Sequence, residues 1–147
     1  MPPVSPDPAC IAVESLLPHR GRMLLVDRIL DSDDSRTTTL SIAAENWPLC
    51  THGVVNPLIL VELVAQTAGL HNGLTRMQEH GRAMVNRGWL VGIKKAVFHA
   101  AAFPVGARIT TTSQNAFAFD ELREVFGWAS MDGRTVAEVT LQLVEAK

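Results

Sequence analysis

The sequence predicts an α+β domain in which an antiparallel sheet wraps around one long buried helix. Three observations favour this fold: two short β-rich segments near the start, one strongly apolar helical segment, and four β-rich segments joined by short turns. The chain has 147 residues, 47% hydrophobic and 19% charged, which is ordinary for one globular domain. We expect a single domain over residues 1–147, with the proline-rich residues 1–10 forming a flexible arm.

The first two strands follow this arm. The run from Met23 to Leu30 is typical of a buried strand, and the polar cluster Asp31–Asp34 is typical of a turn. Arg36–Ile42 contains three consecutive threonines, whose β-branched side chains favour a second strand. The two strands are expected to form a hairpin.

The segment Pro57–Gly73 predicts the long helix. A proline is tolerated in the first turn, and Gly73 is placed to end the helix. Apolar residues cover every face of this segment, so we expect the helix to lie within the domain instead of on its surface.

The rest of the chain returns to a β pattern. Asp132-Gly133 is a strong signal for a two-residue hairpin, and the last strand alternates apolar and polar residues, which predicts a sheet with one face in water. Such a sheet leaves an open edge that a second copy would cover, so we expect at least a homodimer. The four expected strands are Trp89–Phe98, Arg108–Ala116, Leu122–Ala129 and Thr135–Val144.

Composition excludes several classes of protein. The net charge of −2 is too balanced for a nucleic-acid surface, and Cys10 and Cys50 have neither metal-type spacing nor the pattern of a disulfide framework. The longest apolar stretch, Val54–Leu70, is interrupted by polar residues and is too short to span a bilayer. We expect a cytoplasmic protein without a metal, in which both thiols are free.

Glu62 and Gln66 interrupt the apolar helix and invite a chemical explanation. Burying a carboxylate on such a helix costs roughly several kcal/mol unless it is paired, neutral or facing a cavity. Gln66 lies one turn later and could orient the carboxyl group, while His52 lies just before the helix. An imidazole and a carboxyl group can act as base and acid at neutral pH. An alternative left open is that Glu62 and Gln66 only satisfy backbone groups of nearby loops.

Other candidates carry weaker signals. We interpret His19, at the entrance to a strand, as structural, and the loop around Cys50 argues against a thiol nucleophile. The three remaining histidines have no spacing to a second type of metal ligand. Basic side chains usually form a solvated face, although some could receive a phosphate-bearing ligand. The basic candidates are Arg20, Arg22, Lys94, Lys95 and Arg108.

Several segments, taken together, resemble the hot-dog fold β-hydroxyacyl-[acyl-carrier-protein] dehydratases of fatty acid synthesis. The resemblance covers nearly the whole chain, and the Glu-x-x-x-Gln pattern of the helix is its most dehydratase-specific part. The segments are Leu16–Arg20 with Met23–Arg28, His52 with Leu60–Gln66, Gly92–Phe98, Phe103–Ala107, and Asp132–Glu138.

The resemblance implies a hot-dog fold and a two-subunit active site. His52 would take the α-proton of a 3-hydroxyacyl thioester, and Glu62 of the partner subunit would protonate the departing hydroxyl. Gln66, Gly53 and Leu58 would bind substrate. No cofactor is implied beyond the phosphopantetheine arm of the substrate, carried by acyl carrier protein or coenzyme A. The partners would be a second copy, a higher homo-oligomer or a hot-dog paralogue, in fatty acid or polyketide-type synthesis.

The chain departs from the family pattern beside the helix. Asn56-Pro57 stands where the family has Pro-Gly, and Pro57 has no N–H to donate to the thioester carbonyl, so we expect the Leu58 N–H or another amide to take that role. Two alternatives follow. One is a thioesterase of the same fold, in which Glu62 activates water; the other is a weakly catalytic acyl-thioester-binding subunit that needs a partner.

Overall fold

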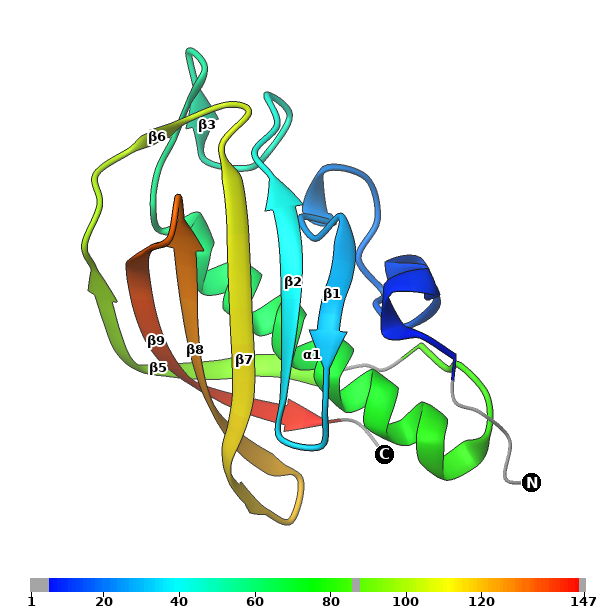
Figure 1. Ribbon diagram of the computed structural model, residues 1–147. Helices are drawn as coiled ribbons and strands as arrows, with labels where there is room; N and C mark the ends of the chain where they lie inside the picture. The colour runs from blue at the N-terminus through cyan, green and yellow to red at the C-terminus, as the bar shows by residue number, and fades with distance from the viewer. Residues whose placement is uncertain (1–5, 86–87, 146–147) are drawn as a thin grey trace.

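The computed structural model describes residues 6–85 and 88–145 (Figure 1). One antiparallel sheet has the strand order β1-β2-β7-β8-β9-β5 and curves around the long helix α1 (Ile59–His80). Its strands are β1 (Arg28–Ser32), β2 (Arg36–Ile42), β5 (Gly88–Phe98), β7 (Arg108–Phe119), β8 (Leu122–Met131) and β9 (Arg134–Glu145). A small second sheet contains β3 (Cys50–Thr51), β4 (Val54–Val55) and β6 (Phe103–Pro104). The predicted α+β architecture is confirmed.

The chain before β1 differs from the expectation. The predicted strand over Met23–Val26 is wrong, because Met23 ends a 3-10 helix (Gly21–Met23) and β1 begins only at Arg28. The side chain of Gln66 explains this difference, since it binds the Met23 carbonyl and the Leu25 N–H that a neighbouring strand would otherwise satisfy.

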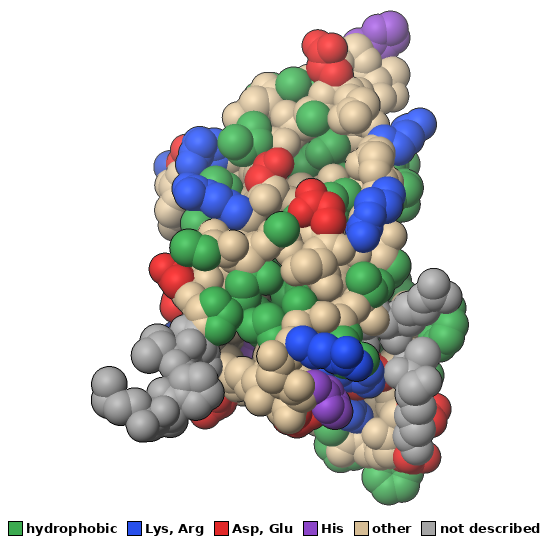
Figure 2. Space-filling view, turned by 90° about the vertical axis from the view of Figure 1, so that its right-hand side faces the viewer, with side chains coloured by type: hydrophobic (Ala, Val, Ile, Leu, Met, Phe, Trp, Pro, Cys, Tyr) green, Lys and Arg blue, Asp and Glu red, His purple; other side chains and the backbone are tan. Residues whose placement is uncertain are grey.

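Two further 3-10 helices lie in the N-terminal segment, Pro8–Cys10 and Val13–Ser15. Residues 1–5 of the expected flexible arm lie outside the described residues, whereas Pro8–Cys10 packs near β1. From the side of these helices, the surface mixes acidic, basic and apolar side chains (Figure 2). Among the described residues, no helix is long and apolar enough to cross a membrane.

Helix α1 is longer and less evenly buried than predicted. It ends at His80, where Gly81 adopts a left-handed conformation (φ 73°), and not at Gly73. A Cβ atom at Gly73 would lie 3.2 Å from the Cβ of Leu16, so this glycine permits close packing instead of ending the helix. The helix also leaves one stripe partly uncovered, where Glu62 and Ala65 retain contact with solvent.

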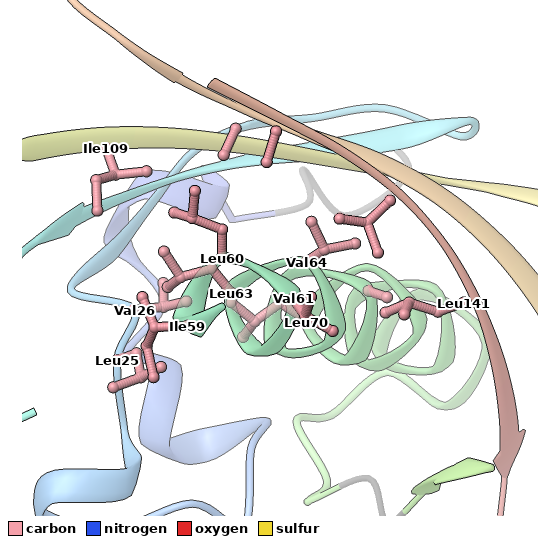
Figure 3. Packing of buried hydrophobic residues seen from close by; sticks show 14 of the residues in the cluster. Leu25, Val26, Ile59, Leu60, Val61, Leu63, Val64, Leu70, Ile109 and Leu141 are labelled. Carbon is pink, nitrogen blue, oxygen red and sulfur yellow. The ribbon is translucent and has the colours of Figure 1, made fainter. Parts of the chain in front are cut away.

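The hydrophobic core fills the space between α1 and the sheet. Leu60, Leu63 and Val64 of the helix are fully buried, as are Ile109 of β7 and Leu141 of β9 (Figure 3). The β8–β9 hairpin turns at Asp132-Gly133 with φ values of 50° and 77°, which confirms the predicted two-residue turn.

Close backbone approach at Gly127 of β8 supports this packing. A Cβ there would lie 2.4 Å from Cγ1 of Val64 and 2.9 Å from the Thr112 carbonyl oxygen. We expect Gly127→Ala to lower the free energy of unfolding by about 3 kcal/mol, measured by urea denaturation. Gly92→Ala is the control, because the close contact of its Cβ, at 2.9 Å, would be with Oε1 at the movable end of the Gln142 side chain. Equal effects of the two substitutions would contradict this account.

A seam of hydrogen-bonded polar groups crosses the core where α1 meets β2 and β7. Buried His71 of the helix contacts Thr37 through Nδ1 at 2.8 Å. The other contacts are Thr39 Oγ1 with Thr67 Oγ1 at 2.9 Å, Ser113 Oγ donating to the Val64 carbonyl at 2.8 Å, and Asn115 Nδ2 donating to Asn72 Oδ1 at 3.1 Å. These bonds satisfy polar groups that burial would otherwise penalise.

His71 makes the stability of the fold sensitive to acid. Desolvation by burial lowers the pKa of His71 from its ordinary value of 6.5, and Asp33 and Asp34 oppose that shift. The unfolded chain therefore binds a proton more readily, so the free energy of unfolding falls as the pH drops through 6.5 toward the lowered folded-state value. We expect His71→Asn to reduce the difference between unfolding free energies at about pH 7.5 and about pH 5.5. An unchanged difference would contradict this assignment.

Candidate active site

Glu62 lies in the first turn of α1, on the stripe that the sheet leaves partly uncovered. Its carboxyl oxygen Oε1 lies 3.1 Å from Nε2 of Gln66 and 3.4 Å from Nε2 of His19. The Glu62 and His19 side chains are 31% and 30% exposed, so both are screened from most solvent but remain reachable. The structure thus brings together the predicted pair Glu62 and Gln66, and adds His19.

Gln66 is anchored on both sides of its amide group and is only 1% exposed. Its Oε1 accepts the Leu25 N–H at 3.0 Å, and its Nε2 donates to the Met23 carbonyl at 2.7 Å. Gln66 therefore satisfies backbone groups of a neighbouring segment, and in addition it contacts the Glu62 carboxyl group.

A cavity opens beside Glu62 and runs along α1 toward the edge strand β5. Its volume is about 140 Å³, below the roughly 300 Å³ at which small-molecule sites begin. The lining is mainly apolar and includes residues from both ends of the chain: Leu17, Pro18, His19, Glu62, Ala65, Gly69, Asn72, Gly88, Leu90, Leu143, Val144 and Glu145. Because Gly88 and Leu90 belong to β5, a chain paired with this edge would help to enclose the cavity.

His52 lies away from this cavity, at the turn between β3 and β4. Thr51 pairs with Val54, which leaves His52-Gly53 as a two-residue hairpin turn. Their φ values of 55° and 75° are both left-handed, as the twist of such a hairpin requires. The turn exposes the His52 side chain, and His52 does not line the Glu62 cavity within one chain.

The left-handed conformation predicts a stability cost at His52. Asn-Gly is the preferred pair for this type of turn, so His52→Asn should raise the free energy of unfolding by about 0.5–1 kcal/mol. His52→Ala, which keeps a Cβ but gains no local hydrogen bond, should show no such gain. Thermal unfolding of the two variants beside the wild type would measure the effect, and a lower midpoint for His52→Asn would refute it.

The backbone amides near the helix start are not equally free. The Leu58 N–H, expected to replace the donor missing at Pro57, donates to Oδ1 of Asn56 at 3.0 Å. Asn56 thus occupies this amide in the turn that precedes α1, a local side-chain-to-backbone bond that is common for this residue type. The structure gives the Gly53 N–H no hydrogen-bond acceptor among the described residues.

The remaining candidates fall elsewhere. Cys50 is half-buried in β3, where the described part of the chain shows no base paired with its thiol, and His99 contacts Glu138 at the surface at 2.8 Å. Of the basic residues, Lys94 binds Glu124 at 3.3 Å, and Arg20 binds backbone carbonyls. Within residues 6–85 and 88–145, no group of side chains could hold a metal ion.

Known proteins match this chain over most of its length. Residues 11–147 match the family of ApeP-like dehydratases. The 3-hydroxyacyl-[acyl-carrier-protein] dehydratase FabZ of Streptococcus equi subsp. zooepidemicus is 28% identical over 134 residues, covering 88% of this chain and 91% of that protein. The FabZ protein of Streptococcus uberis is 30% identical, with the same coverage.

Solved structures share the fold at lower identity. The dehydratase heterocomplex ApeI:P from Xenorhabdus doucetiae matches with a TM-score of 0.82 at 18% identity, covering 93% of this chain and 92% of that one. A hypothetical thioesterase with coenzyme A from Streptococcus pneumoniae matches with a TM-score of 0.60 at 13% identity, covering 81% and 84%. The predicted hot-dog fold is confirmed. The chain belongs to the ApeP-like dehydratase family, and it is a divergent hot-dog dehydratase.

Proposed function

We propose that the protein dehydrates 3-hydroxyacyl thioesters carried by acyl carrier protein, with His52 as the base and Glu62 of a partner subunit as the acid. The observation that carries this proposal is Glu62 itself. It is a carboxyl group held by side-chain contacts on an apolar helix, in a cavity open toward an uncovered sheet edge.

In the proposed reaction, His52 removes a proton from C2 of the acyl group. The electron pair forms the C2–C3 double bond while the hydroxyl group leaves C3, and Glu62 protonates that hydroxyl to give water. Proton transfer from His52 back to Glu62 resets the site. Negative charge develops on the thioester oxygen during the first step, and the Gly53 N–H, beside His52, is the amide that we assign to this oxygen.

The edge strand β5 supports a site shared between two subunits. β5 lies at the edge of the sheet that the described residues form, and its Trp89, Val91 and Ile93 side chains are 58%, 56% and 50% exposed. A hot-dog chain paired there would cover these side chains and approach the Glu62 cavity, which Leu90 already lines. The substrate would occupy the enlarged cavity beside Glu62, and Gln66, which is buried and does not line the cavity, would act on it through its contact with Glu62.

The test is mass spectrometry of a 3-hydroxyacyl carrier protein incubated with the wild type and with His52→Ala. Loss of one water with the wild type alone is the expected result. Release of the acyl group would instead indicate a thioesterase, and loss of water with both proteins would contradict the role of His52.

A second candidate is a subunit that is active only in a complex with another hot-dog protein. Pro57 lacks an N–H and the Leu58 N–H is occupied by Asn56, so this chain presents fewer amide donors beside the helix than the family pattern supplies. An unchanged thioester with the protein alone, followed by dehydration after a hot-dog paralogue is added, would favour this second candidate.

A further inference from the structure

The contacts of Glu62 are unequal at its two oxygens. Both polar neighbours, Gln66 and His19, approach Oε1. For Oε2, the described part of the chain shows neither a hydrogen bond nor an ion pair. One oxygen is therefore held by the protein, while the other is available to the cavity.

The direction of the Gln66 contact follows from the backbone. The Leu25 N–H can only donate and the Met23 carbonyl can only accept, so these two groups determine which end of the Gln66 amide is the nitrogen. That nitrogen also faces Glu62. Gln66 is consequently a hydrogen-bond donor to Oε1.

The His19 ring offers a similar argument. Its Nδ1 is buried and has no hydrogen-bond partner among the described residues. A tautomer with its proton on Nδ1 would bury an N–H without an acceptor, which is costly. In the neutral tautomer with the proton on Nε2, Nδ1 carries no hydrogen and the Nε2–H faces Glu62.

The backbone around His19 is held in place by Arg20. Its Nη1 donates to the Leu17 and His19 carbonyls at 2.6 and 2.7 Å, and its Nη2 donates to the Glu14 carbonyl at 2.9 Å. These bonds fix the turn that presents His19 to α1. Glu145, another charged side chain lining the cavity, pairs with arginines.

We infer that His19 is a positioning residue for Glu62, an inference that rests on the proposed function. The Gln66 hydrogen bond and the His19 ring nitrogen that faces Oε1 at 3.4 Å favour Oε1 as the carbonyl oxygen of the protonated acid, so the transferable proton resides on Oε2, for which the described residues show no partner. His19 and Gln66 thus select which oxygen delivers the proton to the leaving hydroxyl. Such selection acts on the chemical step and not on substrate binding.

Three substitutions test this role. His19→Gln places an amide nitrogen near the former Nε2, whereas His19→Asn reaches only the Nδ1 position and His19→Leu has no donor. We expect kcat to fall about tenfold in His19→Leu and His19→Asn with KM changed less than about twofold, and most of the loss to be recovered in His19→Gln. Thermal unfolding identifies variants that fail to fold. Equal kcat in the Gln and Leu variants, or a loss expressed in KM, would overturn the inference.

A second measurement does not depend on turnover. Long-range proton–nitrogen NMR spectra of the wild type with 15N-labelled histidine, assigned by comparison with His19→Gln, report the tautomer of His19 at neutral pH. The neutral Nε2–H tautomer is expected, and an Nδ1–H tautomer or an imidazolium would overturn the assignment. Wild-type protein that shows the expected tautomer but no dehydration would instead contradict the proposed function.

Discussion

Replacing Glu62 with glutamine is expected to reduce dehydration by about 10²- to 10⁴-fold, since the amide cannot supply the proton that the leaving hydroxyl needs. The amide has nearly the same shape and can still accept the Gln66 hydrogen bond, so the fold should survive. Mass spectrometry of the acyl carrier protein over time measures the rate, and circular dichroism verifies the fold.

A matched control separates the loss of this proton from a general loss of charge. Glu138 is a half-exposed carboxylate on β9 that also contacts a histidine, His99, but it lies outside the Glu62 cavity. Glu138→Gln should keep activity within about twofold of the wild type. If Glu62→Gln turns over as fast as Glu138→Gln, Glu62 is not the acid.

Mixed dimers of two inactive variants should regain activity. A dimer of one His52→Ala chain and one Glu62→Gln chain contains one doubly damaged site and one intact site, if each site takes His52 from one chain and Glu62 from the other. Mixed dimers purified through two different tags should therefore show about half of the wild-type rate per dimer, while each variant alone stays inactive.

The mixed-dimer experiment also has a clear negative outcome. Two-tag purification with no recovered activity would show that His52 and Glu62 do not come from opposite chains of a dimer. It would then favour a site within one chain, where His19 is the histidine beside Glu62.

The elements that depend on local pattern could be predicted from the sequence. The threonine-rich β2 has the predicted bounds, Arg36–Ile42, and the hairpin turn lies at Asp132-Gly133, as the sequence predicts. The second hairpin turn, His52-Gly53, was missed, although glycine after a residue that tolerates a left-handed conformation is a usable signal.

Features that depend on long-range contacts could not be predicted. His19 and Glu62 are distant in the sequence and no periodicity relates them, so the contact between them had no local signal. The strand predicted at Met23 failed for the same reason. Its carbonyl is satisfied by a glutamine on a helix that follows much later in the chain, and an apolar pattern carries no information about such a bond.

The occupied amide of Leu58 could be predicted in part. Pro57 has no N–H, and the sequence therefore favoured Leu58, the next amide along the chain, as the replacement donor. Asn56, two residues earlier, is a residue type whose side chain often binds such amides near helix starts. The sequence therefore indicated that Asn56 would compete with a substrate for the Leu58 N–H.

The polar seam between α1 and the sheet has a consequence for how accurately the acid is placed. Apolar side chains tolerate small displacements along a helix axis, but a shift by one residue, about 1.5 Å, would disrupt the bonds of Thr67 and His71 to β2. The hydrogen bonds of these buried hydroxyl groups therefore fix the position of the helix along its axis. They set how far Glu62 projects toward the open edge, even though none of them touches the carboxyl group.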